Sequence, residues 1–302
     1  MRNAFADSIY KLKKKYKNLI LLSGDIGNKL FDKFKKKYPN NFYNCGVAEN
    51  NMVGVAAGLA SVGFHPLVYT ITPFLTSRSY EQIKIDICYP GRKVIIIGTG
   101  SGLSYSRLGV THHSLDDISL MNSIPDMQIF CPGDPFELEA ILELAIKSKK
   151  PSYIRLGKKG EPNVNLKKPK ISIKSPNLIK KGADYVILSC GNTLKIGSDL
   201  QVMLQNNKIS TSLYSFFLVK PINVSFLKKI FKKYKKIIVI EEHSKIGGLS
   251  SIIKNELTVY INKDNFFCFN IQDKFLVGYG EQNEARKKLG LAADQMFHKL
   301  LK

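Results

Sequence analysis

Residues 45–61 read CGVAENNMVGVAAGLAS and place one acid, Glu49, at the start of a segment that is otherwise small and apolar. Apolar side chains occur on every side of this segment, which predicts a helix buried against a larger structure. A carboxyl group held among apolar neighbours is protonated more easily than one in water. From the residues alone, Glu49 is either an acid with a chemical role or an ordinary acid in the first turn of a helix.

The composition is that of a globular protein, and 302 residues are enough for two α/β domains. No apolar run has the length of a membrane span, and the N-terminus lacks the apolar core of a signal peptide. The five cysteines are scattered and form no CxxC pair, which is typical of a reducing compartment and argues against a metal site or a disulfide framework. We therefore expect a cytoplasmic protein with no membrane partner.

The net charge of +22 is unusual. A basic protein can bind nucleic acid, anionic lipid or phosphorylated substrates. In this chain the lysines are spread over expected helix faces and one linker, and no RNA-binding motif or aromatic ladder lies among them. The pattern favours a lysine-rich solvated surface, so no nucleic-acid partner is expected.

Strand-like and helix-like segments alternate along the chain. The expected strands are short apolar runs, at 19–23, 42–45, 66–70, 93–98, 127–131 and 152–156, then at 185–192, 211–216, 236–243 and 266–271. Between the two series the periodicity is lost and Lys and Pro accumulate, which is typical of a linker. The sequence therefore predicts an α/β protein with two consecutive parallel-sheet domains of three layers each. Their expected limits are 1–157 and 178–302, with the linker at 158–177.

Several motifs occur together, in one order, over essentially the whole chain. They are GVAENNM at 46–52, TITPFLTSRSYEQIKID at 70–86, GVTHHSLDDISLMNSIPDMQIFCPGDPFE at 109–137, PSYIRLGKKG at 151–160 and VIEEHSKIGGLSS at 239–251. Together they resemble the C-terminal half of transketolase, its pyrimidine-binding domain followed by its C-terminal domain. The related 1-deoxyxylulose-5-phosphate synthases and 2-oxoacid dehydrogenase β subunits share this layout. The resemblance identifies the chain as the C-terminal subunit of a split transketolase.

The resemblance implies a thiamine diphosphate site. Glu49 matches the family acid that hydrogen-bonds N1′ of the aminopyrimidine, which helps the cofactor to lose its C2 proton. Phe74 matches the aromatic residue that stacks on the pyrimidine. Ile71 stands where relatives have a second aromatic residue. The resemblance thus makes Glu49 a catalytic and cofactor-binding residue and places Phe74 and Ile71 beside the cofactor.

Substrate residues are also implied by the resemblance. His112 matches the transketolase histidine that contacts the substrate next to the reacting carbon, and it is the second catalytic candidate. His113 follows at a position where the family often has Gln, and it is a substrate candidate. Leu108 departs from the family, because transketolases carry there an aspartate that binds the donor hydroxyls.

The phosphate-binding positions of the family correspond to Arg2, Lys29, Gly100 and Lys158. Only Arg2 keeps its residue type, Gly100 has no side chain to bind with, and Lys lacks the bidentate fork of Arg. Arg155 is a further anion candidate, because its guanidinium could replace the missing one. The usual pentose-phosphate donors are therefore not expected to be preferred.

One family motif is missing from this chain. Thiamine diphosphate enzymes hold the diphosphate through Mg²⁺ with a GDG sequence and a later Asn. The GDI at 24–26 is similar, but it already belongs to the pyrimidine-domain pattern. No metal ligand is predicted here, so Mg²⁺ is expected on a partner, an N-terminal transketolase subunit with the GDG and Asn motif. The expected assembly is a heterotetramer with two copies of each chain.

Three functions remain open at this stage. The first is a transketolase-like subunit of an enzyme that cleaves a ketose or 2-oxo acid next to its carbonyl and transfers the fragment to an aldehyde. The second is a 2-oxoacid dehydrogenase β-type subunit, which delivers an acyl group to a lipoyl carrier. The third is a non-catalytic paralogue, which the altered phosphate positions support. The GVAENNM motif and the histidine segment favour the first.

Overall fold

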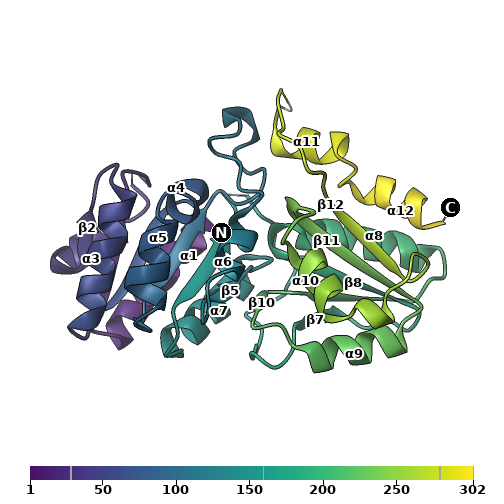
Figure 1. Cartoon of the computed structure of the whole chain (residues 1–302), viewed down its shortest axis with the longest axis horizontal. Coiled ribbons are helices and arrows are strands. Elements are labelled where there is room, and N and C mark those ends of the chain that lie inside the picture. Colours follow the sequence, from purple (N-terminus) through teal and green to yellow (C-terminus); the bar gives the residue numbers. More distant parts are fainter. Residues whose placement is uncertain (28, 159, 279, 302) are drawn as a thin grey trace.

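The apolar runs of the sequence form the strands of two separate sheets in the computed structural model, which describes residues 1–27, 29–158, 160–278 and 280–301. Each sheet is the centre of one α/β lobe, and the two lobes lie side by side (Figure 1). Helices cover both faces of each sheet, so the predicted fold class, two three-layer α/β domains, is confirmed.

The first sheet is built on central strands whose residues are buried along their whole length. Such continuous apolar runs are expected of parallel strands that are covered on both faces. Within the described residues this sheet has seven strands in the order β10-β5-β6-β4-β3-β1-β2. Their bounds are β1 (Leu19–Ser23), β2 (Phe42–Asn44), β3 (His65–Ile71), β4 (Ile95–Thr99), β5 (Gln128–Phe130), β6 (Ser152–Leu156) and β10 (Leu218–Lys220).

Strand β10 belongs to the second half of the chain, yet it extends the first sheet. It pairs antiparallel with β5, with Leu218 opposite Phe130. The backbone N–H of Cys131 also donates to the carbonyl oxygen of Phe217 at 2.6 Å. The sequence pattern did not predict this strand, because three residues are too few to show a strand period. A segment of the second lobe thus closes the edge of the first sheet and ties the lobes together.

The second sheet has five strands within the described residues, in the order β12-β11-β8-β9-β7. Strands β8, β9, β11 and β12 are parallel, as predicted, whereas β7 is an antiparallel edge strand beside β9. Strand β7 was not predicted, because it begins at the end of the expected linker. The bounds are β7 (Asn177–Lys180), β8 (Tyr185–Cys190), β9 (Thr211–Ser215), β11 (Lys236–Ser244) and β12 (Phe266–Ile271).

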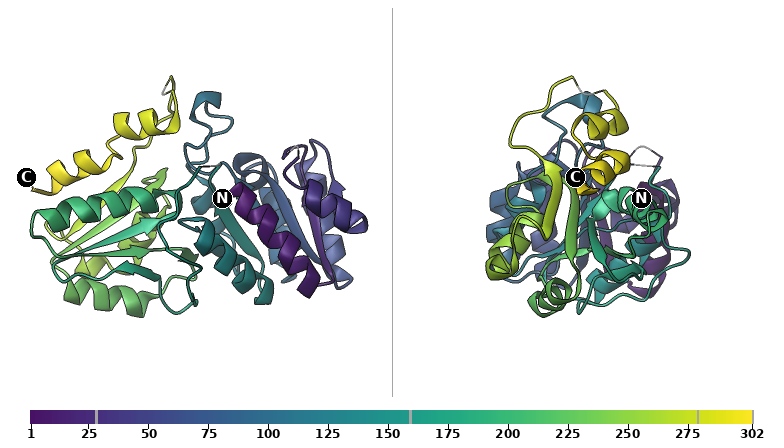
Figure 2. Two further views of the ribbon diagram at one scale, coloured as in Figure 1. Left: turned by 180° about the vertical axis from the view of Figure 1, so that it is seen from behind. Right: turned by 90° about the vertical axis from the view of Figure 1, so that its right-hand side faces the viewer.

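The helices form the outer layers. One face of the first sheet packs on α1 (Arg2–Lys15), α2 (Asp32–Lys37) and α7 (Pro135–Lys147), and Figure 2 shows α1 on this side. The other face packs on α3 (Glu49–Ser61), α4 (Thr72–Thr76), α5 (Tyr80–Gln82), the π-helical turn η2 (Ile83–Cys88) and α6 (Asp117–Asn122). The second sheet packs on α8 (Leu194–Asn206), α11 (Gln282–Lys288) and α12 (Ala293–Leu301) on one face and on α9 (Val224–Lys233) and α10 (Leu249–Glu256) on the other. None of the described helices is both long and apolar enough to cross a membrane.

The segment predicted as a linker is held against the first lobe. Asp134, the N-cap of α7, accepts hydrogen bonds through Oδ2 from the backbone N–H groups of Val164 at 2.9 Å and Asn165 at 2.6 Å. The predicted limits of the two domains stay a prediction. The sheets themselves interleave, because β10 crosses back to the first one.

A buried ion pair lies where the lobes meet. Arg155 Nε donates to Asp117 Oδ2 at 2.7 Å, and Arg155 Nη2 donates to the carbonyl oxygens of Ser114 and Glu242, each at 3.0 Å. Tyr153 OH donates to the same Asp117 oxygen at 2.6 Å. Burial acts to raise the pKa of Asp117, but the charge of Arg155 outweighs it and holds the pKa below its ordinary value. This ion pair therefore joins the first sheet, α6 and the end of β11.

Asp117→Asn is expected to lower the free energy of unfolding by ~3–5 kcal/mol, because it leaves the Arg155 charge buried without its counter-ion. Because the folded-state pKa of Asp117 is depressed, its contribution is present above the unfolded-state pKa and lost as the pH falls through the folded-state value. Urea denaturation of wild type and variant at several pH values measures both effects. The control is Asp126→Asn, which removes an exposed pair with Lys150 and should cost ~0–1 kcal/mol. Equal losses from the two variants would contradict a stabilising role for the buried pair.

Candidate functional site

The acid singled out by the sequence is the first residue of α3. Glu49 is only 3% exposed, and α3 packs through Met52 and Val53 into the core. Thr70, near the end of β3, donates through Oγ1 to Glu49 Oε1 at 3.4 Å. Gly24, which follows β1, comes so close that a Cβ there would lie 2.7 Å from Thr70 Oγ1. The carboxyl group therefore lies at the carboxyl edge of the first sheet, beside the ends of β1 and β3.

Helix α3 is buried on one face only, which narrows the sequence expectation of a helix buried all round. Val55 is 42% exposed, and Val62 just beyond the helix is 70% exposed. A Cβ at Gly54 or Gly58 would meet no atom within 4 Å. The outer face of α3 is therefore smooth, apolar and open, as expected of a surface that another protein could cover.

Arg78 connects Glu49 to Phe74. Arg78 Nη1 donates to Glu49 Oε2 at 2.5 Å, and the guanidinium carbon lies 4.6 Å from the centroid of the Phe74 ring. Phe74 and Arg78 are four residues apart in α4 and the turn after it, which places their side chains on the same side. The sequence motifs did not single out Arg78. The available signal was its spacing of four residues from Phe74 within the quoted motif.

His112 lies next to Phe74. It comes from the segment between β4 and α6, which projects beyond the first sheet toward α11 (Figure 1). The His112 ring lies edge-to-face at 5.1 Å from Phe74 and 5.8 Å from Tyr105, measured between ring centroids. Burial, and second the neighbouring His113, lower the pKa of His112, so the ring is neutral at neutral pH. Its Nδ1 lies 2.9 Å from Thr111 Oγ1, so a hydrogen bond orients the ring.

Tyr105 fills the space beside Gly100. Gly100 has a φ of +83°, and a Cβ there would lie 2.1 Å from Cε2 of Tyr105. A larger residue at position 100 therefore could not coexist with this Tyr105 position. Lys158 Nζ lies 4.7 Å from the centroid of the same ring, a cation–π contact. Tyr105, which the sequence motifs also did not single out, thus connects His112 with Lys158.

Three other predicted residues lie near this edge of the sheet without contacting Glu49. Arg2, at the start of α1, donates through Nε to the hydroxyl of Tyr69 in β3 at 3.0 Å. Lys29 is exposed and has a left-handed backbone with φ +65°. Ile71 is 9% exposed and precedes α4. The anion candidates Arg2 and Lys158 therefore come from separate segments.

The structure does not bring His113 and Arg155 into the cluster. His113 is buried, and its Nε2–H donates to the carbonyl oxygen of Ser106 at 3.0 Å. It lines a cavity of about 380 Å³ between its own segment and residues 272–276. Arg155 is 2% exposed and bound by Asp117, so the predicted role as an anion-binding residue is not supported. Its strand end faces the second lobe, which a sequence alignment alone could not reveal.

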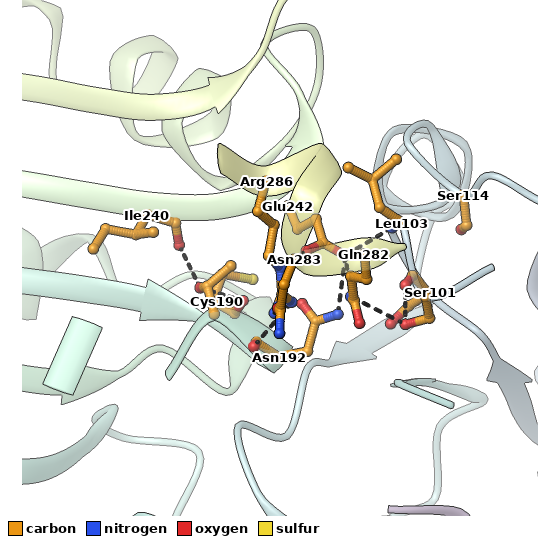
Figure 3. Close-up of polar contacts among 12 residues, drawn as sticks. Ser101, Leu103, Ser114, Cys190, Asn192, Ile240, Glu242, Gln282, Asn283 and Arg286 are labelled. Carbon is orange, nitrogen blue, oxygen red and sulfur yellow. Dashed lines mark hydrogen bonds and ion pairs between the residues drawn. The ribbon is translucent and has the colours of Figure 1, made fainter. Parts of the chain in front are cut away.

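Glu242, at the end of β11, holds the His112 segment against the second lobe (Figure 3). Its Oε1 accepts hydrogen bonds from the backbone N–H of Leu103 at 2.7 Å, from Gln282 Nε2 at 2.8 Å and from Asn192 Nδ2 at 3.2 Å. Arg286 Nε donates to Oε2. Glu242 is fully buried, so these donors are needed to satisfy it. The second lobe therefore positions the segment that carries His112.

The GDI sequence does not form a metal site with its neighbours. Asp25 accepts a hydrogen bond from Asn44 Nδ2 at 3.2 Å. In the part of the chain that the structure describes, no three His, Cys, Asp or Glu side chains are grouped so that they could hold a metal ion.

Comparison with known proteins agrees with this architecture. The transketolase pyrimidine-binding domain matches residues 1–162, and the transketolase C-terminal domain matches residues 176–269. One of the two kinds of chain of the apulose-4-phosphate transketolase of Phocaeicola vulgatus is 31% identical over 259 residues, 85% of this chain and 83% of that protein. The 1-deoxy-D-xylulose-5-phosphate synthase of Methylacidiphilum infernorum is 30% identical over 99% of this chain but only 47% of its own length.

A solved structure supports the same assignment over the full chain. It is a split-gene transketolase described as an inactive β4 tetramer, and it matches with a TM-score of 0.88 at 28% identity. The match covers 99% of this chain and 96% of that one. From its two domains, its fold and these relatives, this chain belongs to the transketolase family, and it consists of the pyrimidine-binding domain followed by the C-terminal domain.

Proposed function

We propose that the chain is the C-terminal subunit of a split, thiamine diphosphate-dependent enzyme that cleaves a ketose or 2-oxo acid next to its carbonyl and transfers the fragment to an aldehyde. The observation that carries this proposal is the grouping of Glu49, Phe74 and His112. Three separate segments supply them, and Arg78 and the ring contact at 5.1 Å connect them. Residues proposed for the cofactor and for the substrate are therefore neighbours.

The residues present fit the aminopyrimidine of the cofactor. The guanidinium of Arg78, a flat group that donates hydrogen bonds, already lies over Phe74 and contacts Glu49. The space beside Phe74 therefore accepts a flat group with a donor aimed at the carboxyl. An aminopyrimidine protonated at N1′ has both properties.

Each residue has a definite task in this proposal. Glu49 holds a proton at N1′ of the pyrimidine, and Phe74 orients the ring by stacking. When bound, thiamine diphosphate supplies the nucleophilic carbon that attacks the substrate carbonyl. The neutral His112 keeps Nδ1 engaged with Thr111, so Nε2 is the nitrogen for a substrate oxygen. Arg2 and Lys158 attract an anionic group of the substrate.

The proposal includes a partner chain, because ligands for Mg²⁺ and the diphosphate are assigned to it. The partner is an N-terminal transketolase subunit with the GDG and Asn motif, and the assembly is a heterotetramer with the cofactor between the two kinds of chain. The open apolar face of α3, next to Glu49, supports this arrangement. A cytoplasmic location is also proposed, supported by five cysteines that are all free thiols.

Fructose 6-phosphate and xylulose 5-phosphate are expected to be poor donors. Leu108 and Gly100 offer no polar side chain for the sugar, and the Tyr105 ring takes up the space at Gly100. Steady-state assays of the reconstituted enzyme should give much higher kcat/KM with another donor. Apulose 4-phosphate belongs in the panel, because the relative from Phocaeicola vulgatus is named for it. Transketolase-like efficiency on either common sugar would contradict this prediction, and transfer to a lipoyl carrier would favour a dehydrogenase subunit.

A further inference from the structure

Arg78 makes two contacts that the cofactor ring would also need. It donates to Glu49 Oε2 at 2.5 Å, and its guanidinium carbon lies 4.6 Å from the Phe74 centroid. We propose that Arg78 belongs to the cofactor site as an internal competitor of the aminopyrimidine, which must displace the guanidinium from both Glu49 and Phe74 to bind. This inference rests on the proposed function, because it takes Glu49 and Phe74 as the residues that bind the ring.

The chemistry of the two groups explains why one can replace the other. A guanidinium is planar, carries its N–H donors in the plane and stacks on aromatic rings. An aminopyrimidine protonated at N1′ is also planar and donates in its plane. A carboxylate and the face of a phenylalanine ring recognise both groups by the same two interactions. Since one carboxyl oxygen and one ring face are shared, both groups cannot be bound in this way at once.

The exposure of the two partners shows which of them can move away. The Arg78 side chain is 43% exposed, whereas that of Glu49 is 3% exposed. The guanidinium can therefore withdraw into water on its flexible stem, while the carboxyl group stays at the start of α3. A buried carboxylate without a partner is costly. In this arrangement Glu49 keeps a donor in both states, Arg78 before the ring binds and the pyrimidine afterwards.

The competition should be modest in size. Ion pairs with an exposed partner are weak, and a single exposed cation–π contact is weak as well. Removing the guanidinium should therefore tighten ring binding about tenfold, which corresponds to about 1.4 kcal/mol. If Arg78 were instead an ordinary ligand of the cofactor, its removal would weaken binding. The sign of the change thus separates the two roles.

The test uses the full chain and the cofactor ring without its diphosphate, 4-amino-5-hydroxymethyl-2-methylpyrimidine. Its Kd is measured by NMR chemical-shift titration for wild type, Arg78→Gln and Arg78→Lys. The control is Lys84→Gln, which removes an exposed positive charge from the next helical turn. We expect Kd to fall about tenfold for Arg78→Gln, to fall less for Arg78→Lys, which keeps the charge but not the plane, and to be unchanged for Lys84→Gln.

Thermal unfolding of each variant confirms that it is folded before titration. If Arg78→Gln does not fold, the Arg78→Lys variant decides, and a Kd equal to or above that of wild type overturns the proposal. Equal Kd values for wild type and Arg78→Gln overturn the competition but leave the proposed function standing, because the ring still binds. Weaker binding by Arg78→Gln makes Arg78 a ligand and also overturns it. If no folded variant binds the ring, the inference and the assignment of Glu49 and Phe74 fail together.

Discussion

Replacing Glu49 by Gln is expected to lower kcat of the assembled enzyme by ~10²–10⁴-fold, the range for a positioned acid–base group. An amide has nearly the same shape as the carboxyl group but cannot hold and release a proton at N1′ of the pyrimidine. Glu49 is 3% exposed, so water cannot readily take its place. Stopped-flow or steady-state assays with saturating cofactor and donor measure the loss in kcat.

The control for this variant is the same substitution at Glu256, an exposed residue at the end of α10. It should leave kcat unchanged. Unfolding curves of Glu49→Gln should lie close to those of wild type, because the amide can still accept the bonds from Thr70 and Arg78. If Glu49→Gln retains most of the wild-type kcat, Glu49 is an ordinary first-turn acid and the proposed mechanism is wrong.

The isolated chain is expected to show no turnover and no tight binding of thiamine diphosphate, and both should appear when the partner subunit is added. The diphosphate and Mg²⁺ carry most of the charge of the cofactor, and the proposal assigns their ligands to the partner. This chain offers Glu49 and Phe74, which make a contact only the size of a fragment. Arg78 lowers the affinity of that contact further.

Calorimetric titration of the isolated chain with thiamine diphosphate and Mg²⁺ tests this dependence. The matched measurement uses the two subunits mixed at equal concentration, where binding and ketose cleavage should both be detected. The split-gene transketolase of known structure is described as inactive in its β4 tetramer, which agrees with the expectation for this chain. Micromolar binding of the cofactor, or turnover of any ketose, by the isolated chain would refute the split site.

Much of the fold follows from local patterns in the sequence. The buried parallel strands, such as β1 and β4, stand out because their residues are apolar on both faces. Helix α3 stands out because small and apolar residues follow one acid. The antiparallel edge strands β7 and β10 were missed, because one lies at the end of an aperiodic segment and the other has three residues. Short edges carry little periodicity, so only the pairing itself reveals them.

The sequence by itself determined the order of the elements, the family and the motifs that contain Glu49, Phe74 and His112. Such information is local, since a period or a motif is complete within one segment. Only the tertiary structure decided which side chains meet. It paired Arg78 with Glu49 and placed the Tyr105 ring in the space at Gly100. It also buried Arg155, an expected anion ligand, against Asp117 between the lobes. These contacts join segments far apart in the chain, and burial and charge in the folded state select them, so no single segment encodes them.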